Sequence, residues 1–156
     1  MQKNEKLIGV LNDLIRINND RFEGYKNLLT SQVQLGKEQR LLVYNMADQS
    51  RAFTSDLITE VIKLRTAENS GASLSAGIYR QSMSFSSSFS GVTQNEILLA
   101  CQHLEEAIQK AYYDAICMAI EVPDRILNLV NDQKREMKVA SSMIKDSMDL
   151  KHAVAA

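Results

Sequence analysis

The chain has no tryptophan, one proline, two cysteines and two histidines among its 156 residues. A single proline leaves long stretches without a helix breaker, which favours an all-helical chain. The two cysteines, Cys101 and Cys117, lie on one expected helix about 24 Å apart, at roughly 1.5 Å per residue. That separation is too long for a disulfide. Because reduced thiols are typical of the cytoplasm, we expect a cytoplasmic protein.

An excess of one charge sign is also missing. The chain has 18 basic and 19 acidic side chains, and its formal net charge is −1. This balance gives no overall electrostatic footprint for a nucleic acid. The first twenty residues mix charges into their apolar run, whereas a secretory signal or a membrane span needs an uninterrupted one. We therefore expect neither a nucleic-acid partner nor a membrane partner.

What the sequence does contain is helical periodicity. Apolar side chains recur at spacings of three and four residues along four long segments. The pattern predicts helices over residues 4–31, 37–67, 94–120 and 123–151. Helix-start signals support these bounds, because Asn4, Thr93 or Asn95 can cap a first turn and Pro123 is tolerated there. Matched lengths, roughly 40 Å each at the α-helical rise, favour a four-helix bundle within a single domain spanning 1–156.

The connection between the second and third helices is the longest. It covers residues 69–92 and is rich in serine, in contrast to the short connections elsewhere. A structureless loop of this length is uncommon in a compact domain. Its apolar side chains follow a helical spacing; they are Leu74, Ile78, Phe85 and Phe89. We expect a partly helical crossover packed on the bundle, with a disordered linker as the alternative.

Three stretches resemble a known family of uncharacterised bacterial proteins. They are LNDLIRINNDRFEGYKNLLTS, SAGIYRQSMSFSSSFSG and ILLACQHLEEAIQKAYYDAI, and the similarity extends over residues 4 to about 145. The family belongs to the ferritin-like superfamily of four-helix bundles and is described as having unknown function. The chain departs from its relatives at Tyr79-Arg80, where they have His-Arg, and at Gln102, where they have an acid. The resemblance implies a ferritin-like fold and little biochemistry.

One polar residue interrupts the apolar stripe of each expected helix: Asn18, Gln49, Glu105 and Gln133. Counted from the helix ends they lie at a similar height, with Tyr112 two turns from Glu105. One interpretation is a hydrogen-bonded interior layer that sets helix register. The others are a degenerate metal or small-ligand pocket, and a Glu105 that reaches water at the stripe's edge. A buried, ionised Glu105 needs a cation, and the candidates are Arg21, Arg51 and Arg135.

A complete iron or manganese site is not predicted. Ferritin-like bundles hold two metal ions with Glu-x-x-His pairs on two helices and a Glu on each of two others. The chain has no Glu-x-x-His, and the nearest pattern is Asp149 with His152 at the end of the last helix. His103 falls on a helix flank. Glu23, the alternative partner for Glu105, lies off the first stripe.

These patterns favour a non-catalytic, ferritin-like bundle that acts by association or stress-related binding. No phosphate-binding loop and no triad of catalytic side chains is recognisable. Tyr44, Tyr113 and Ile116 lie off the main stripes, so we expect a homo-oligomer. The alternative is an oxidoreductase or metal store of the di-iron or di-manganese type, with a degenerate site at Glu105 and Glu23.

Overall fold

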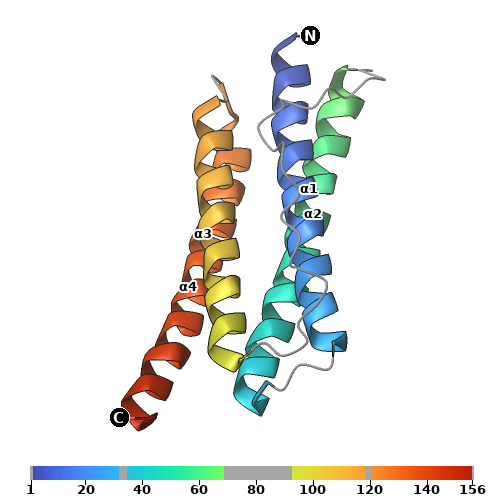
Figure 1. Ribbon diagram of the computed structural model, residues 1–156. Helices are drawn as coiled ribbons and strands as arrows, with labels where there is room; N and C mark the ends of the chain where they lie inside the picture. The colour runs from blue at the N-terminus through green and yellow to red at the C-terminus, as the bar shows by residue number, and fades with distance from the viewer. Residues whose placement is uncertain (1, 32–34, 69–92, 119–120, 156) are drawn as a thin grey trace.

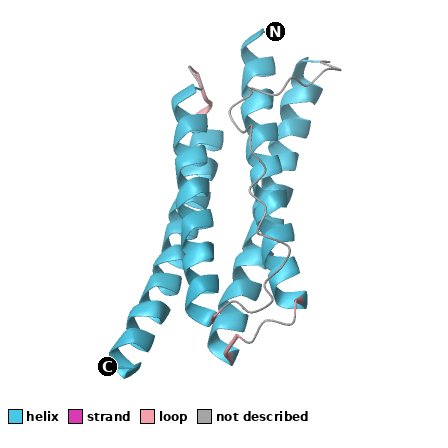
Figure 2. Ribbon diagram, in the orientation of Figure 1, coloured by secondary structure: helices cyan, strands magenta, loops and turns pink. Residues whose placement is uncertain are grey.

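The structure, a computed structural model, describes residues 2–31, 35–68, 93–118 and 121–155, with side chains described between Asn4 and Ser147 except 67–68. It consists of α1 (Gln2–Thr30), α2 (Lys37–Glu68), α3 (Gln94–Met118) and α4 (Asp124–Ala155). Figure 2 shows helices and loops, without a strand, in these ranges. The prediction of an all-α four-helix bundle is confirmed. The expected crossover at 69–92 lies outside the described residues.

The four helices form two antiparallel pairs. In Figure 1, α1 runs downwards and α2 upwards, while α3 runs upwards and α4 downwards, so α2 and α3 are parallel. Helix α1 packs against α2 and α3, and α4 packs against the same two helices. Helices α1 and α4 are therefore diagonal to each other across the bundle. This arrangement leaves each helix with two neighbours and one interior face.

Local sequence explains where two of the helices begin. Thr93 caps α3, since its Oγ1 accepts a hydrogen bond from the Glu96 backbone N–H at 3.2 Å. The Glu96 carboxylate accepts one from the Thr93 N–H at 3.4 Å, and the two bonds form a capping box. Pro123 precedes α4, and its carbonyl accepts bonds from Ile126 and Leu127. The expectation that Asn4 caps the first helix is wrong, because α1 already begins at Gln2.

The core follows the predicted stripes with small rotations. Fully buried side chains come from all four helices, for example Leu14, Leu57, Ile108 and Ile126. On α1 the buried face is wider than predicted and includes Ile8, Ile17 and Leu28. Phe22 and Leu29, which were expected inside, pack only partly against the core. The wider face follows from the two neighbours that α1 has to contact.

The described helices also bear on the membrane prediction. Among residues 2–31, 35–68, 93–118 and 121–155, no helix carries an apolar stretch that would cross a bilayer.

Candidate functional site

A chain of buried hydrogen bonds joins all four helices at mid-bundle. Asn18 on α1 donates from Nδ2 to the Tyr112 hydroxyl on α3 at 2.7 Å. That hydroxyl donates to Gln133 Oε1 on α4 at 2.8 Å. Gln133 Nε2 in turn donates to the Phe53 carbonyl on α2 at 3.3 Å. The chain therefore connects each helix to the next through a buried polar contact.

A buried ion pair lies beside this chain. Arg21 Nε on α1 is 2.8 Å from Glu105 Oε1 on α3, and both side chains are 0 % exposed. The Tyr25 hydroxyl donates a hydrogen bond to the same carboxylate oxygen at 2.5 Å. Burying a charge without a partner is costly, so the guanidinium supplies the counter-charge that the interior carboxylate needs.

The guanidinium also ties α2 into the layer. Arg21 Nη1 donates to Ser50 Oγ at 2.9 Å and to the Met46 carbonyl at 3.3 Å. The guanidinium carbon stands 5.6 Å from the centre of the Tyr25 ring, within the range of a cation–π contact. One arginine therefore connects three helices through its fixed fork of donors.

The spacing of residues on α1 and α3 explains why these pairs meet. Tyr25 follows Asn18 by seven residues, and Tyr112 follows Glu105 by seven residues. Positions seven apart lie on the same helical face, two turns from each other. Because α1 and α3 run in opposite directions, Asn18 meets Tyr112 at one height and Tyr25 meets Glu105 at the other.

The electrostatics of the layer keep its weak acids protonated. Burial, followed by the charge of Glu105, raises the pKa of Cys101 to about 12. Burial raises the pKa of Tyr25 well above its usual value, and the neighbouring Glu105 carboxylate adds to the effect. Burial also raises the pKa of Tyr112, although its bond to Asn18 acts in the opposite direction. The layer thus holds hydrogen-bond donors and one neutral thiol around a single carboxylate.

The donor set does not suit the metal centre that the resemblance to ferritin-like bundles led us to consider. Three polar atoms of the layer have no hydrogen-bond partner among the described residues: Asn18 Oδ1, Glu105 Oε2 and Arg21 Nη2. Two of them are oxygens that can bind a cation, but the third belongs to a guanidinium that repels one. In the described part of the chain, no three His, Cys, Asp or Glu side chains come together as metal ligands. The residues present therefore do not fit a di-iron or di-manganese group.

The structure brings together most of the polar residues singled out from the sequence, but not all. Asn18, Glu105, Tyr112 and Gln133 are buried and share one layer. Gln49 is only half-buried, and its Oε1 has no partner among the described residues.

The structure shows which of the proposed metal ligands and cations lie near Glu105. Glu23 is exposed on α1 and does not join Glu105 in the interior, and His103 is exposed on α3. Of the three candidate cations, Arg21 alone reaches Glu105. Arg51 lies over the Phe22 ring at 5.7 Å, and Arg135 pairs with Asp132 at 3.2 Å. The side chains of Asp149 and His152 are outside the described residues.

Two members of the layer were missed by sequence reasoning. Tyr25 was assigned to the apolar stripe, and its hydroxyl bond to Glu105 has no local sequence signal. Ser50 is fully buried, whereas the neighbouring Gln49 was expected in the interior. Gln49 and Ser50 both lie three or four residues from Met46 and from Phe53, so helical periodicity alone could not show which of the two is buried.

The fold and this layer define a class: an all-α four-helix-bundle protein whose interior carries a hydrogen-bonded ion pair. Within that class, the chain belongs to the family described as Domain of unknown function (DUF2383), whose profile matches residues 6–117. No curated protein and no solved structure matches the chain.

Proposed function

We propose that the protein is a non-catalytic, ferritin-like bundle that acts by association, first of all with a second copy of itself. The observation that carries this proposal is a row of exposed apolar side chains on α2. Leu41, Tyr44, Ile58 and Ile62 are exposed by 60 %, 58 %, 42 % and 58 %. They lie on the opposite side of α2 from buried residues such as Leu57, so they are not part of the bundle's own core.

This surface has the spacing of a coiled-coil seam. Exposed residues follow one another at alternating spacings of three and four, forming what we name the outer stripe: Leu41, Tyr44, Asp48, Arg51, Ser55, Ile58 and Ile62. Such a repeat is typical of helices that pack against another helix along their whole length. The sequence-based argument for association used Tyr44, Tyr113 and Ile116. Both tyrosines are exposed, but Ile116 packs partly against the core and does not support it.

The charges within the outer stripe favour a second copy as the occupant. Asp48 and Arg51 have no ion-pair partner among the described residues. In an antiparallel pair of α2 helices related by a twofold axis near the stripe's middle, Asp48 of one copy faces Arg51 of the other. The same register sets Leu41 against Ile58 and Tyr44 against Ser55. A twofold axis produces every such contact twice, as an isologous interface requires.

A charge swap tests this interface. Asp48→Arg places like charges opposite each other at two symmetric positions, and Arg51→Asp does the same with acids. We expect each single variant to weaken the dimer roughly tenfold or more. The double variant Asp48→Arg/Arg51→Asp exchanges the two partners and restores the dimer. Light scattering on size-exclusion fractions over a micromolar concentration range measures the mass.

The matched control is Asp56→Arg, which changes an exposed acid on the same helix outside the outer stripe. It should leave the mass unchanged. A monomeric native protein at micromolar concentration would overturn the proposal. A dimer that none of the stripe variants weakens would place the interface elsewhere.

Ferritin-like kinship and a metal-free interior are parts of the same proposal. The parallel direction of α2 and α3 supports the kinship, because it is the order expected of a bundle with a long middle crossover. The Arg21–Glu105 pair supports the metal-free interior, since the guanidinium already neutralises the carboxylate. Elemental analysis of protein purified without chelators tests it. A stoichiometric iron, manganese or zinc content that Glu105→Ala removes would instead establish the metal store or oxidoreductase.

The free state of Cys101 and Cys117 supports a cytoplasmic location, because oxidising compartments favour disulfides. The location itself, the organisation of residues 1–156 as one domain and a stress-related role remain predictions.

A further inference from the structure

An open groove runs between α3 and α4 on the outside of the bundle. Its volume is about 850 Å³, and its walls carry five cationic side chains: Lys110, Lys134, Arg135, Lys138 and Lys145. The one acidic side chain among its described lining residues is Glu106. Since the whole chain has a net charge of −1, this groove is a local concentration of positive charge.

The lysines of the groove are not neutralised by the protein. Among the described residues, no carboxylate lies within ion-pair distance of Lys110, Lys134, Lys138 or Lys145. Arg135, by contrast, already pairs with Asp132. A row of like charges without counter-charges is unfavourable for the folded state by itself, and it attracts an anion from solution.

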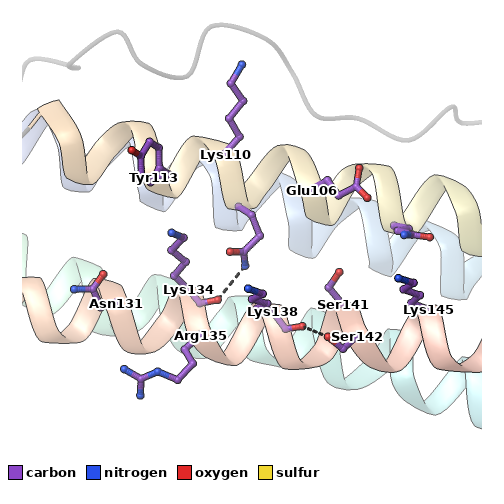
Figure 3. A pocket seen from close by; sticks show the side chains of 12 residues that line it. Glu106, Lys110, Tyr113, Asn131, Lys134, Arg135, Lys138, Ser141, Ser142 and Lys145 are labelled. Atoms are coloured by element: carbon purple, nitrogen blue, oxygen red, sulfur yellow. Dashed lines mark hydrogen bonds between the residues drawn. The ribbon is translucent and has the colours of Figure 1, made fainter.

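Three of the lysines form a row along one wall. Figure 3 shows Lys134, Lys138 and Lys145 between the two helices, whereas Lys110 extends away from α4 and Arg135 away from α3. At the helical rise, the row is about 16 Å long. Lys134 Nζ lies 5.2 Å from the centre of the Tyr113 ring, where it makes a cation–π contact. The row therefore suits an extended anion better than a single small one.

We propose that this groove binds a linear chain of phosphate groups, namely inorganic polyphosphate. The remaining described lining consists of amide and hydroxyl side chains such as Gln102, Asn131 and Ser141, which donate hydrogen bonds to phosphate oxygens. Lysine binds phosphate as a point charge and does not require a fixed geometry. A flexible chain with a charge at every unit meets the uneven spacing of Lys134, Lys138 and Lys145.

The lining also distinguishes polyphosphate from other extended anions. No aliphatic side chain is among the described lining residues, so an acidic peptide would find no pocket for apolar side chains. Single-stranded nucleic acid needs aromatic platforms for its bases. The groove offers Tyr113 alone, and Lys134 occupies that ring. Polyphosphate has neither side chains nor bases, so the lysines and the amide and hydroxyl donors of the groove are sufficient to bind it.

The test is a binding titration of fluorescently labelled polyphosphate, followed by anisotropy at low and physiological salt. We expect saturable binding that weakens steeply with salt, because each lysine displaces counter-ions. The variant Lys138→Ala/Lys145→Ala should bind at least about tenfold more weakly, since it removes two of the three charges in the row.

The matched control is Lys6→Ala/Lys37→Ala, which removes two exposed lysines from other helices and should bind like the native protein. Circular dichroism verifies that the helices are retained in each variant.

An absence of binding at low salt, or an equal loss in both double variants, would overturn the proposal. Tighter binding of poly-glutamate or of oligothymidylate would overturn it in favour of an acidic peptide or a nucleic acid. The groove is independent of the outer stripe, so Asp48→Arg should bind polyphosphate normally.

Discussion

The molecule uses its charged side chains in two contrasting ways. In the interior, Arg21 and Glu105 are fully buried and bound to each other. On the surface, Lys138 and Lys145 line a groove and have no ion-pair partner among the described residues. The difference follows from solvation, because a buried charge destabilises the fold unless it is paired, whereas water stabilises an exposed one. An interior charge therefore needs a partner on another helix, whereas an exposed charge does not.

The largest effect is expected from breaking the interior pair on one side. Arg21→Met leaves Glu105 buried without its counter-charge and Ser50 without its donor. We expect the free energy of unfolding to fall by about 3–5 kcal/mol, as measured by urea denaturation followed by circular dichroism.

Two further variants show whether charge is the cause. Arg21→Met/Glu105→Leu removes both charges and should recover most of the lost stability. Arg135→Met, which removes an arginine whose ion pair with Asp132 is exposed to solvent, should change stability little. An Arg21→Met protein as stable as the native one would contradict the role given to the pair.

A smaller effect is expected from cutting the neutral hydrogen-bond chain. Tyr112→Phe removes the hydroxyl that joins Asn18 to Gln133 and leaves Gln133 Oε1 without its donor. The expected loss is about 1–3 kcal/mol, the usual range for an unsatisfied buried polar group. Tyr113→Phe, the adjacent but exposed tyrosine, is the matched control. Equal losses in the two variants would show that the buried chain adds nothing specific.

Alkaline pH should lower the free energy of unfolding, because buried groups that stay protonated in the folded protein lose their protons in the unfolded chain. The pKa of Cys101 rises from 9.0 to about 12 in the folded protein, so between these values the unfolded chain has lost a proton that the folded chain keeps. The free energy of unfolding should therefore be independent of this thiol below pH 9. Above pH 9 it should fall by roughly 1.4 kcal/mol per pH unit.

Denaturation midpoints measured between pH 7 and 11 test this slope. Cys101→Ala removes the titrating group, so its stability should fall less steeply with pH even if its baseline is lower. An unchanged slope in this variant would assign the alkaline loss to other groups, of which Tyr25 and Tyr112 also have raised pKa values.

The smallest effect is expected from an ion pair that has one exposed partner. Arg125 donates from Nε and Nη2 to Glu60 Oε2 at 3.1 and 2.8 Å, in the same kind of contact as Arg21 makes with Glu105. The Arg125 side chain, however, is 58 % exposed, and Glu60, at 9 %, keeps a second cation because Lys63 Nζ lies 3.4 Å from its Oε1. Arg125→Ala should cost less than about 1 kcal/mol, and less still in high salt. A loss as large as that of Arg21→Met would remove the distinction between interior and surface pairs.

Sequence reasoning reached the interior layer only in part. Glu105 and Gln133 interrupt otherwise apolar stripes, so helical periodicity assigned them correctly to the buried face. Arg21 was one of three candidate cations for Glu105, because the stripe pattern places an arginine on a face but does not say how far it reaches. Gln49 was expected in the interior, but it is half-buried and the neighbouring Ser50 is the buried residue. Which of the two is buried depends on a rotation of α2 by less than a third of a turn, which periodicity does not resolve.

The sequence by itself determined the four helices, most of their apolar faces and the capped start of α3, because these depend on contacts within a few residues. The tertiary structure alone decided which polar residues meet. Arg21 and Glu105 are 84 positions apart, and their contact depends on the direction, rotation and height of two antiparallel helices. The lysine groove has the same origin, since it exists only where α3 and α4 lie side by side. Local periodicity contains no information about either arrangement.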